Sequence, residues 1–242
     1  MLALPVRAQQ ATAPPLRVAA AADLQTVLPT LLQEYRRRTG VQVLVSYGSS
    51  GTLAAQLLNG APQDLFLGAD AQYPAKVVAA GLTTESEPVP YARGTLVLWA
   101  RQDSPLQPIS LQTLSSGRVQ SLAMADPGHA PYGRAAQAAL EHLGLLTTLQ
   151  PHLVVAENIA QAGQFAESGN AQAGLLSLTL AQSPRFRQLG SYVVMPRVYP
   201  EILQCGVVLR AGQTAAAQAF LDWLRLPATQ AELPALGLAP AR

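Results

Sequence analysis

Three loops of the sequence combine small residues with polar ones, and each lies where a predicted strand passes into a predicted helix. They contain the pair Ala22-Asp23, the segment GSSGT (48–52) and the segment DPGHAPYG (126–133). The start of a helix offers up to four free N–H groups and a partial positive charge. Glycine lets the backbone approach a ligand, and serine hydroxyls add donors that can rotate. Because the three loops contain no lysine or arginine, together they could bind a desolvated anion through neutral hydrogen-bond donors.

Each loop also has a simpler interpretation, since small polar residues at such turns often only cap a helix. Other chemistries fit the motifs less well. The loop YGSSGT is not G-x-S-x-G because residue 52 is threonine, and a P-loop is excluded because Lys76 is the only lysine. No G-x-G-x-x-G follows the first strand. The three histidines, at 129, 142 and 152, lack the spacing of a helical metal pair.

The elements that must position these loops alternate between strand and helix. Strands are predicted at residues 16–22, 41–47 and 64–69, and helices begin at Asp23 and cover residues 52–59 and 72–80. The helix that begins at Asp23 has an apolar face that recurs at helical spacing, and Gly40 ends it. This alternation predicts a doubly wound parallel sheet with right-handed crossovers.

A second lobe is predicted after a Thr-, Glu- and Pro-rich loop at residues 82–90. Its strands are expected at 94–100, 119–124, 152–156 and 173–178, with helices at 132–143 and 159–168. A strand at 201–210 and a helix at 214–225 then return to the first lobe. The predicted division is residues 15–91 and 201–242 for the first lobe and 92–200 for the second, with a cleft between them. Cys205, Trp99 and Trp223 are expected in the core.

Composition narrows the class of protein. The 242 residues are 49% hydrophobic and 12% charged, which excludes a disordered chain. The net charge is +2 and the longest basic run is Arg36-Arg37-Arg38, so the pattern of a nucleic-acid-binding protein is missing. Residues 1–14 are interpreted either as the remnant of a secretory signal or as a disordered polar tail.

Five segments together resemble the periplasmic molybdate-binding proteins of ABC importers. They are VAAAADLQ (18–25), YGSSGTLAAQLLNGAPQDLFLGAD (47–70), ADPGHAPYGRAAQAAL (125–140), AENIAQ (156–161) and GNAQAGLLSL (169–178). The resemblance implies the type II periplasmic binding protein fold, two doubly wound α/β lobes joined by two crossing segments. It implies a monomeric periplasmic protein without enzymatic activity or a cofactor. Such a protein captures molybdate or tungstate and passes it to a membrane-embedded ABC permease.

The resemblance also implies a set of oxyanion contacts at matching positions of this chain. They are Ala22 or Asp23, the Ser50 hydroxyl, the backbone amides of Tyr132 and Ile159, and, where some members have a tyrosine, Ser177. Ser49, Asn158 and His129 are further candidates for the cleft, although Asn158 and His129 could equally serve as a helix cap and a loop residue bonded to backbone. No residue is expected to ligate a metal cation directly. Because a serine hydroxyl reaches less far than that of a tyrosine, Ser177 leaves open a backbone shift, a substitute contact from Tyr132 or a missing hydrogen bond.

Asp23 is the main departure from the family pattern, because a carboxylate beside a dianion is repulsive. Its side chain could turn back to cap its own helix, which is the interpretation we favour because Asp is a good N-cap. It could instead be protonated and donate a hydrogen bond, or it could accept one from a protonated oxyanion. The alternative functions are a binding protein for another oxyanion or a small organic anion and, less favoured, a serine hydrolase.

Overall fold

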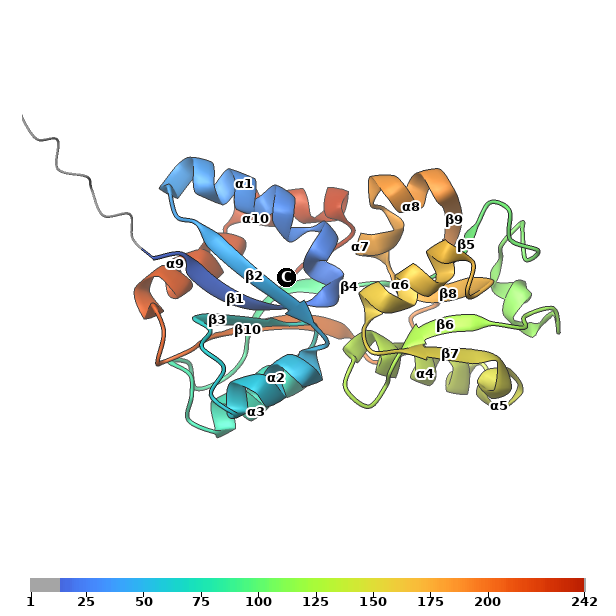
Figure 1. The fold of residues 1–242 in the computed structure, drawn as a ribbon, viewed down its shortest axis with the longest axis horizontal. Coiled ribbons are helices and arrows are strands. Elements are labelled where there is room, and N and C mark those ends of the chain that lie inside the picture. Colours follow the sequence, from blue (N-terminus) through green and yellow to red (C-terminus); the bar gives the residue numbers. More distant parts are fainter. Residues whose placement is uncertain (1–13, 242) are drawn as a thin grey trace, which may run out of the picture.

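The computed structural model describes residues 14–241, which form two α/β lobes lying side by side (Figure 1). Each lobe is built around its own sheet. The interpretation of residues 1–14 falls outside the described residues except at Pro14. In the described part of the chain, no helix is both long and apolar enough to cross a membrane.

The first lobe has a six-stranded sheet in the order β11-β4-β10-β3-β1-β2. Its strands are β1 (Leu16–Ala21), β2 (Val43–Gly48), β3 (Leu65–Gly68), β4 (Val89–Gly94), β10 (Ile202–Val208) and β11 (Ala239–Pro240). Strands β1, β2 and β3 run parallel, as the alternation predicted, and β10 pairs antiparallel to β3 and β4. Helices cover both faces of this sheet (Figure 1): α1 (Leu28–Thr39), α9 (Thr214–Leu224) and α10 (Pro227–Glu232) on one side, α2 (Ser50–Leu58) and α3 (Gln72–Ala79) on the other.

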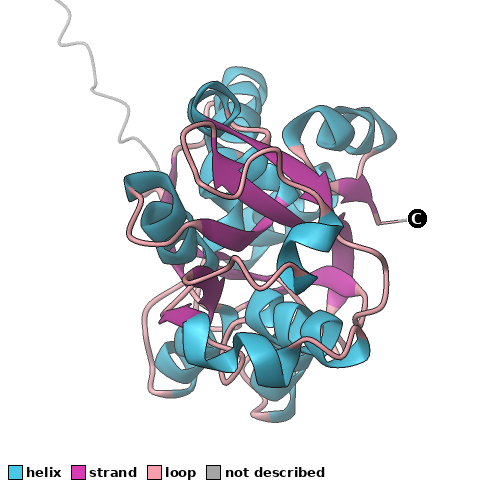
Figure 2. Cartoon of the chain, turned by 90° about the vertical axis from the view of Figure 1, so that its right-hand side faces the viewer, coloured by secondary structure: helices cyan, strands magenta, loops and turns pink. Residues whose placement is uncertain are grey.

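The second lobe has a five-stranded sheet in the order β7-β6-β8-β5-β9. Its strands are β5 (Leu96–Arg101), β6 (Leu122–Ala125), β7 (Leu153–Ala156), β8 (Ala173–Ser177) and β9 (Gly190–Val194). Its helices are α4 (Pro131–His142), α5 (Leu146–Leu149), α6 (Ile159–Ser168), α7 (Leu178–Ala181) and α8 (Pro184–Leu189). Figure 2 shows that helices flank the strands on both sides, the layering of a doubly wound fold.

The described residues also form four 3-10 turns: η1 (Ala22–Thr26), η2 (Leu111–Ser115), η3 (Gln150–His152) and η4 (Leu233–Leu236). The first of them corrects a prediction. The chain makes the turn η1 directly after β1, and the α-helix begins only at Leu28. The end of that helix is as predicted, because Gly40 adopts the left-handed conformation with φ 74°.

Two crossing segments join the lobes, as predicted, but the first lies later than expected. Strand β4 starts within the segment predicted as a loop, so the chain crosses at Thr95 rather than before residue 92. The strand was not predicted because it contains Pro90, and proline rarely lies inside a sheet. The structure accommodates it where the pairing of β10 with β4 shifts register, between Gln204 and Cys205. The second crossing covers residues 195–201, after β9, a strand that the sequence did not indicate.

The residues predicted to be in the core are buried. Trp99 on β5 is fully inaccessible, and Cys205 on β10 and Trp223 on α9 are buried as well. In the first lobe, Phe220 packs at 4.8 Å between ring centroids from Tyr35 and at 5.9 Å from Trp223. This aromatic cluster fixes α1 and α9 against each other over the sheet, and therefore holds the parts of the first lobe that come from the two ends of the chain.

We expect Phe220→Ala to lower the free energy of unfolding by about 3–5 kcal/mol, because the substitution removes a fully buried ring and leaves a cavity. Urea unfolding followed by circular dichroism measures the loss. Leu44→Ala is the matched control: its side chain is exposed, and the cost should be within about 0.5 kcal/mol. Equal losses in the two variants would contradict the packing described here.

Candidate functional site

A small cavity of about 10 Å³ lies between the two lobes. The first lobe contributes the residues that follow β1, β2 and β3, and the second contributes the starts of α4 and α6. The lining residues are Ala21, Ala22, Asp23, Gly48, Ser49, Ser50, Ala69, Ala130, Pro131, Tyr132, Asn158 and Ile159. The three loops singled out in the sequence therefore meet at one place. Their meeting point is the carboxyl end of parallel strands, where α/β folds bind ligands.

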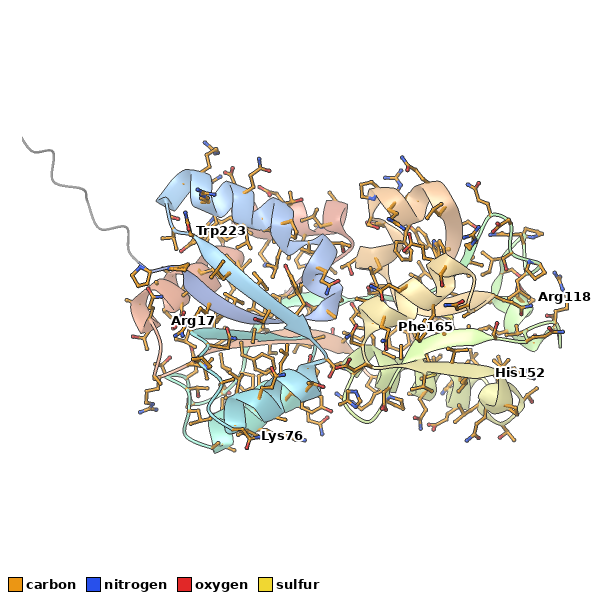
Figure 3. All side chains as sticks on the ribbon, in the orientation of Figure 1. Arg17, Lys76, Arg118, His152, Phe165 and Trp223 are labelled. Carbon is orange, nitrogen blue, oxygen red and sulfur yellow. The ribbon has the colours of Figure 1, made fainter. Side chains whose placement is uncertain are left out.

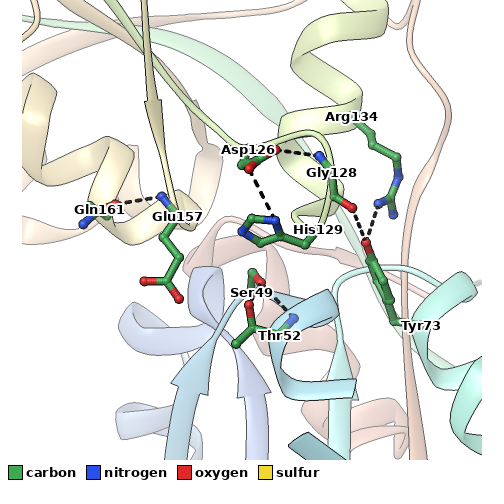
Figure 4. Close-up of polar contacts among 9 residues, drawn as sticks. All are labelled: Ser49, Thr52, Tyr73, Asp126, Gly128, His129, Arg134, Glu157 and Gln161. Atoms are coloured by element: carbon green, nitrogen blue, oxygen red, sulfur yellow. Dashed lines mark hydrogen bonds and ion pairs between the residues drawn. The ribbon is translucent and has the colours of Figure 1, made fainter. Parts of the chain in front are cut away.

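The second loop supplies a buried serine hydroxyl. Ser49 caps α2 by accepting a hydrogen bond from the Thr52 amide at 3.1 Å (Figure 4). The Ser50 Oγ atom accepts a hydrogen bond from the Ala69 amide at 2.9 Å. Because this bond uses an oxygen lone pair, the hydroxyl hydrogen of Ser50 remains available as a donor to a ligand in the cavity.

The second lobe supplies two helix starts. Pro131 occupies the first position of α4, where a missing N–H costs nothing, and Tyr132 follows it in the first turn. Asn158 caps α6, as one of the two sequence interpretations held: its Oδ1 atom accepts hydrogen bonds from the Ala160 and Gln161 amides, both at 3.0 Å. The amides of Tyr132 and Ile159 belong to first turns and have no partner within their own helices. They can therefore donate to a ligand between the lobes.

The prediction that Asp23 caps its own helix is wrong. Ala21 is the N-cap residue of η1, and no side chain caps this turn. The Asp23 carboxyl is buried and faces other elements, and its Oδ2 atom accepts hydrogen bonds from Gln204 Nε2 at 2.5 Å and from Tyr132 Oη at 3.2 Å. Gln204 is held in turn by Tyr91, whose hydroxyl lies 2.9 Å from Gln204 Oε1 and 3.1 Å from the Gly68 carbonyl. The Asp23 carboxyl therefore accepts hydrogen bonds from residues on β10 and α4 instead of capping its own helix.

Burial of the Asp23 carboxyl raises its pKa to about 7, although the hydrogen bonds from Gln204 and Tyr132 oppose the shift. Burial also raises the pKa of Tyr132 well above its usual value, and the nearby Asp23 charge adds to this effect. The other carboxyl oxygen, Oδ1, is buried and has no hydrogen-bond partner among the described residues. The cavity therefore contains an acid whose charge changes near neutral pH.

Two predicted contacts lie outside the residues that line the cavity. The Ser177 hydroxyl is buried, caps α7 and lies 2.8 Å from the Thr179 hydroxyl. His129 contacts Asp126, with 3.4 Å between Nδ1 and Oδ2 (Figure 4), and its carbonyl accepts a hydrogen bond from the Gly51 amide at 2.9 Å. The remaining predicted residues, which do line it, are Ala22, Asp23, Ser49, Ser50, Tyr132, Asn158 and Ile159.

Polar contacts across the interface hold the lobes together beside the cavity (Figure 4). The Tyr73 hydroxyl on α3 donates to the Gly128 carbonyl at 3.0 Å and accepts from Arg134 Nη1 at 3.2 Å. Arg134 on α4 also forms an ion pair with Asp70 of the first lobe. The two lobes are in close contact here. A side-chain carbon at Gly51 of the first lobe would collide with His129 of the second.

The sequence analysis missed Tyr91 and Gln204 as well as Tyr73 and Arg134. Only Gln204 carried a signal, as a polar residue inside the apolar segment ILQCGVV. Some of the cationic side chains lie far from the cavity. Figure 3 shows Arg17, Lys76 and Arg118 at the periphery of the two lobes. In residues 14–241, no group of three or more His, Cys, Asp or Glu side chains could hold a metal ion.

A family model described as bacterial extracellular solute-binding protein matches residues 16–238. The chain belongs to this family. Among individual members, it is 35% identical over 228 residues to the molybdate-binding protein ModA of Rhodobacter capsulatus, with 93% of this chain and 86% of that protein aligned. ModA of Azotobacter vinelandii is 34% identical over 229 residues, with 94% and 90% aligned.

Solved structures of solute-binding proteins share the fold. The periplasmic molybdate-binding protein of Azotobacter vinelandii superimposes with a TM-score of 0.87 at 32% identity, covering 94% of this chain and all of that one. The sulfate-binding protein SubI of Mycobacterium tuberculosis gives 0.77 at 16% identity, with 93% and 86% covered, and this likeness shows the fold alone. The predicted family and the predicted type II fold are both confirmed.

Arg134→Ala should favour opening of this solute-binding protein, because it removes the ion pair with Asp70 and the hydrogen bond to Tyr73 across the interface. We expect a larger radius of gyration by small-angle X-ray scattering without ligand. Ligand affinity should fall about tenfold or more, because hydrogen bonds to a charged group contribute about 1.5–3 kcal/mol and every 1.4 kcal/mol changes the affinity tenfold. Arg37→Ala, which removes an exposed pair with Glu34 inside one helix, should change neither quantity. An unchanged radius and affinity for Arg134→Ala would contradict a closing role.

The raised pKa of Asp23 predicts a pH-dependent stability. A carboxyl whose pKa is higher in the folded state contributes stability that is fully present below about pH 4 and is lost as the pH rises through about 7. The loss should be on the order of a few kcal/mol. The melting temperature of the unliganded protein should therefore fall between pH 5 and 8, and Asp23→Asn should abolish most of this fall. Asp222→Asn, at a half-exposed carboxyl on α9, should preserve it; identical slopes for all three proteins would refute the assignment.

Proposed function

We propose that this protein captures molybdate or tungstate in the interlobe cavity and delivers it, as a periplasmic monomer, to the membrane permease of an ABC importer. The observation that carries the proposal is an interlobe cavity that combines neutral donors from both lobes and has no lysine or arginine among its lining residues. The relatives named as molybdate-binding proteins support the same ligand. On this proposal the protein binds and releases its ligand without changing it chemically.

The donors suit a small tetrahedral oxyanion. The Ser50 hydroxyl comes from the first lobe, and the amides of Tyr132 and Ile159 come from the starts of two helices in the second. Each donor is fixed by the fold: Ser50 is held by the Ala69 amide, and the two amides belong to helix backbones. Fixed donors replace the water shell of the anion without burying a mobile cation, and the helix dipoles add to their attraction.

Lobe closure follows from the division of the donors between the lobes. An open form would present the serine loop and the two helix starts separately. The anion would bind one set first, and the second set would complete its shell on closing. The anion would drive this change only through its higher affinity for the closed state. The contacts of Tyr73 and Arg134 across the interface are the protein's own contribution to that state.

A protonated oxyanion such as hydrogen phosphate is the second candidate ligand. The observation in its favour is the unpartnered Oδ1 atom of Asp23, which could accept a hydrogen bond from the hydroxyl of such an anion if Asp23 were ionised. Molybdate and tungstate carry no such hydroxyl as dianions, so a ligand panel separates the two possibilities.

A panel of molybdate, tungstate, sulfate and phosphate, tested by thermal shift and calorimetry, checks the proposed ligand. At a hundredfold excess over its dissociation constant, the ligand should stabilise the fold by about 2.7 kcal/mol. We expect large shifts with molybdate and tungstate only. A shift with phosphate alone would favour the second candidate, and no shift with any of the four would refute oxyanion binding.

Ser50→Ala should weaken molybdate binding about tenfold, since it removes one neutral donor worth about 0.5–1.5 kcal/mol and leaves the Ala69 amide without its acceptor. Ser177→Ala is the comparison, because the Ser177 hydroxyl lies outside the lining residues, and it should cost less. Calorimetric titration of both variants measures the difference. A larger loss for Ser177→Ala would restore Ser177 as a ligand contact and contradict the donor set proposed here.

A further inference from the structure

The two oxygens of the buried Asp23 carboxyl have unequal surroundings. The Oδ2 atom accepts two hydrogen bonds, from Gln204 Nε2 and from Tyr132 Oη. The Oδ1 atom is buried and has no partner among the described residues, and Asp23 lines the interlobe cavity. A carboxylate would need donors at both oxygens once it is taken out of water. One oxygen with two donors beside one with none is the pattern of a neutral carboxylic acid, whose carbonyl accepts and whose hydroxyl donates.

The network around Asp23 distinguishes the two carboxyl oxygens. Gln204 Nε2 donates to Asp23 Oδ2, and Gln204 Oε1 lies 2.9 Å from the Tyr91 hydroxyl, which is also 3.1 Å from the Gly68 carbonyl. The Tyr132 hydroxyl donates to the same oxygen of Asp23. With Oδ2 accepting these two hydrogen bonds, a proton on Oδ1 leaves both of them in place.

We propose that Asp23 is a specificity-determining donor of the oxyanion site: the neutral acid directs its Oδ1–H to an oxygen of the bound anion, so each anion is captured together with one proton. This inference rests on the proposed function. It explains how an acidic residue can line a cavity for a dianion, since the ionised form would repel the ligand and the neutral form adds a donor to the shell. The raised pKa of about 7 makes the neutral form accessible at physiological pH.

The other ionisable groups near Asp23 do not provide an equivalent proton. Burial raises the pKa of Tyr132 on α4, Tyr91 on β4 and Tyr47 on β2 above the usual tyrosine value, and that of Cys205 on β10 to about 12. Helix α7, which packs on η1, contributes the uncharged Thr179, whose hydroxyl donates to the Asp23 carbonyl at 2.8 Å. Beyond these elements lie Asp70, Glu157 before α6 and His129 before α4. Histidine is the residue type whose charge most often changes between pH 5 and 8, so His129 is the group that an experiment must separate from Asp23.

The test is calorimetric titration with molybdate between pH 6 and 8.5, in pairs of buffers with different ionisation enthalpies. Wild-type protein should take up close to one proton per anion at pH 8, and its affinity should fall by up to about tenfold per pH unit above pH 7. Asp23→Asn keeps an acceptor for Gln204 and Tyr132 and presents a permanent NH₂ donor to the anion. Its binding should be tighter than wild type at pH 8, nearly independent of pH, and without proton uptake.

His129→Gln is the matched control, and it should retain both the proton uptake and the pH dependence of wild type. Loss of the coupling in His129→Gln rather than in Asp23→Asn would overturn the proposal. So would pH-independent binding by wild type, which would leave the proposed function intact. Failure of wild type to bind molybdate or tungstate at any pH would instead refute the proposed function itself.

Infrared difference spectra of the wild-type complex locate the proton without a substitution. The carbonyl stretching band of a protonated carboxylic acid, recognised by its shift in D₂O, should be present in the molybdate complex at pH 8. It should be absent from the complex of Asp23→Asn. Proton uptake without this band would place the proton on the anion and overturn the assignment to Asp23.

Discussion

A multiply charged oxyanion loses its hydration shell when it enters a buried cavity, so every one of its oxygens needs a replacement donor inside the protein. Burying an anion oxygen without a hydrogen-bond donor costs a large free energy, because low-dielectric surroundings penalise a charge far more than they penalise a neutral polar group. The residues that line the interlobe cavity of this chain offer backbone amides and hydroxyls, and none of them is lysine or arginine. The rest of the architecture can be understood as the means of bringing those donors together.

Two sheets are needed because one lobe cannot surround a small anion. The strands β1, β2 and β3 end at one side of the cavity, and α4 and α6 begin at the other. The chain crosses between the lobes twice, so the second lobe is inserted between β4 and β10 of the first. The same strands carry Tyr91 and Gln204, which orient Asp23. The connections between the lobes and the electrostatics of the cavity are therefore built from the same segments.

The local parts of this design could be predicted from the sequence, and the long-range parts could not. The helix starts at Ser50, Pro131 and Ile159 were predicted to within two residues. The loops before the first two were grouped into one anion site from their residues, and the resemblance added Ile159. The orientation of Asp23 depends on Gln204, which is 181 positions away in the sequence, and local capping preference predicted the wrong partner. Strand β4 was missed because Pro90 is tolerated only where the opposite strand shifts register. Ser177 was assigned from the resemblance alone, and in the structure its hydroxyl caps α7 and contacts the Thr179 hydroxyl.

The most direct test of the central claim is a crystal structure of the protein grown with molybdate near pH 6. The account predicts the anion in the interlobe cavity, with its oxygens within about 3.2 Å of Ser50 Oγ, of the Tyr132 and Ile159 nitrogens and of Asp23 Oδ1. An anion held by arginine or lysine side chains elsewhere would contradict it. So would an anion in the cavity with Asp23 turned away.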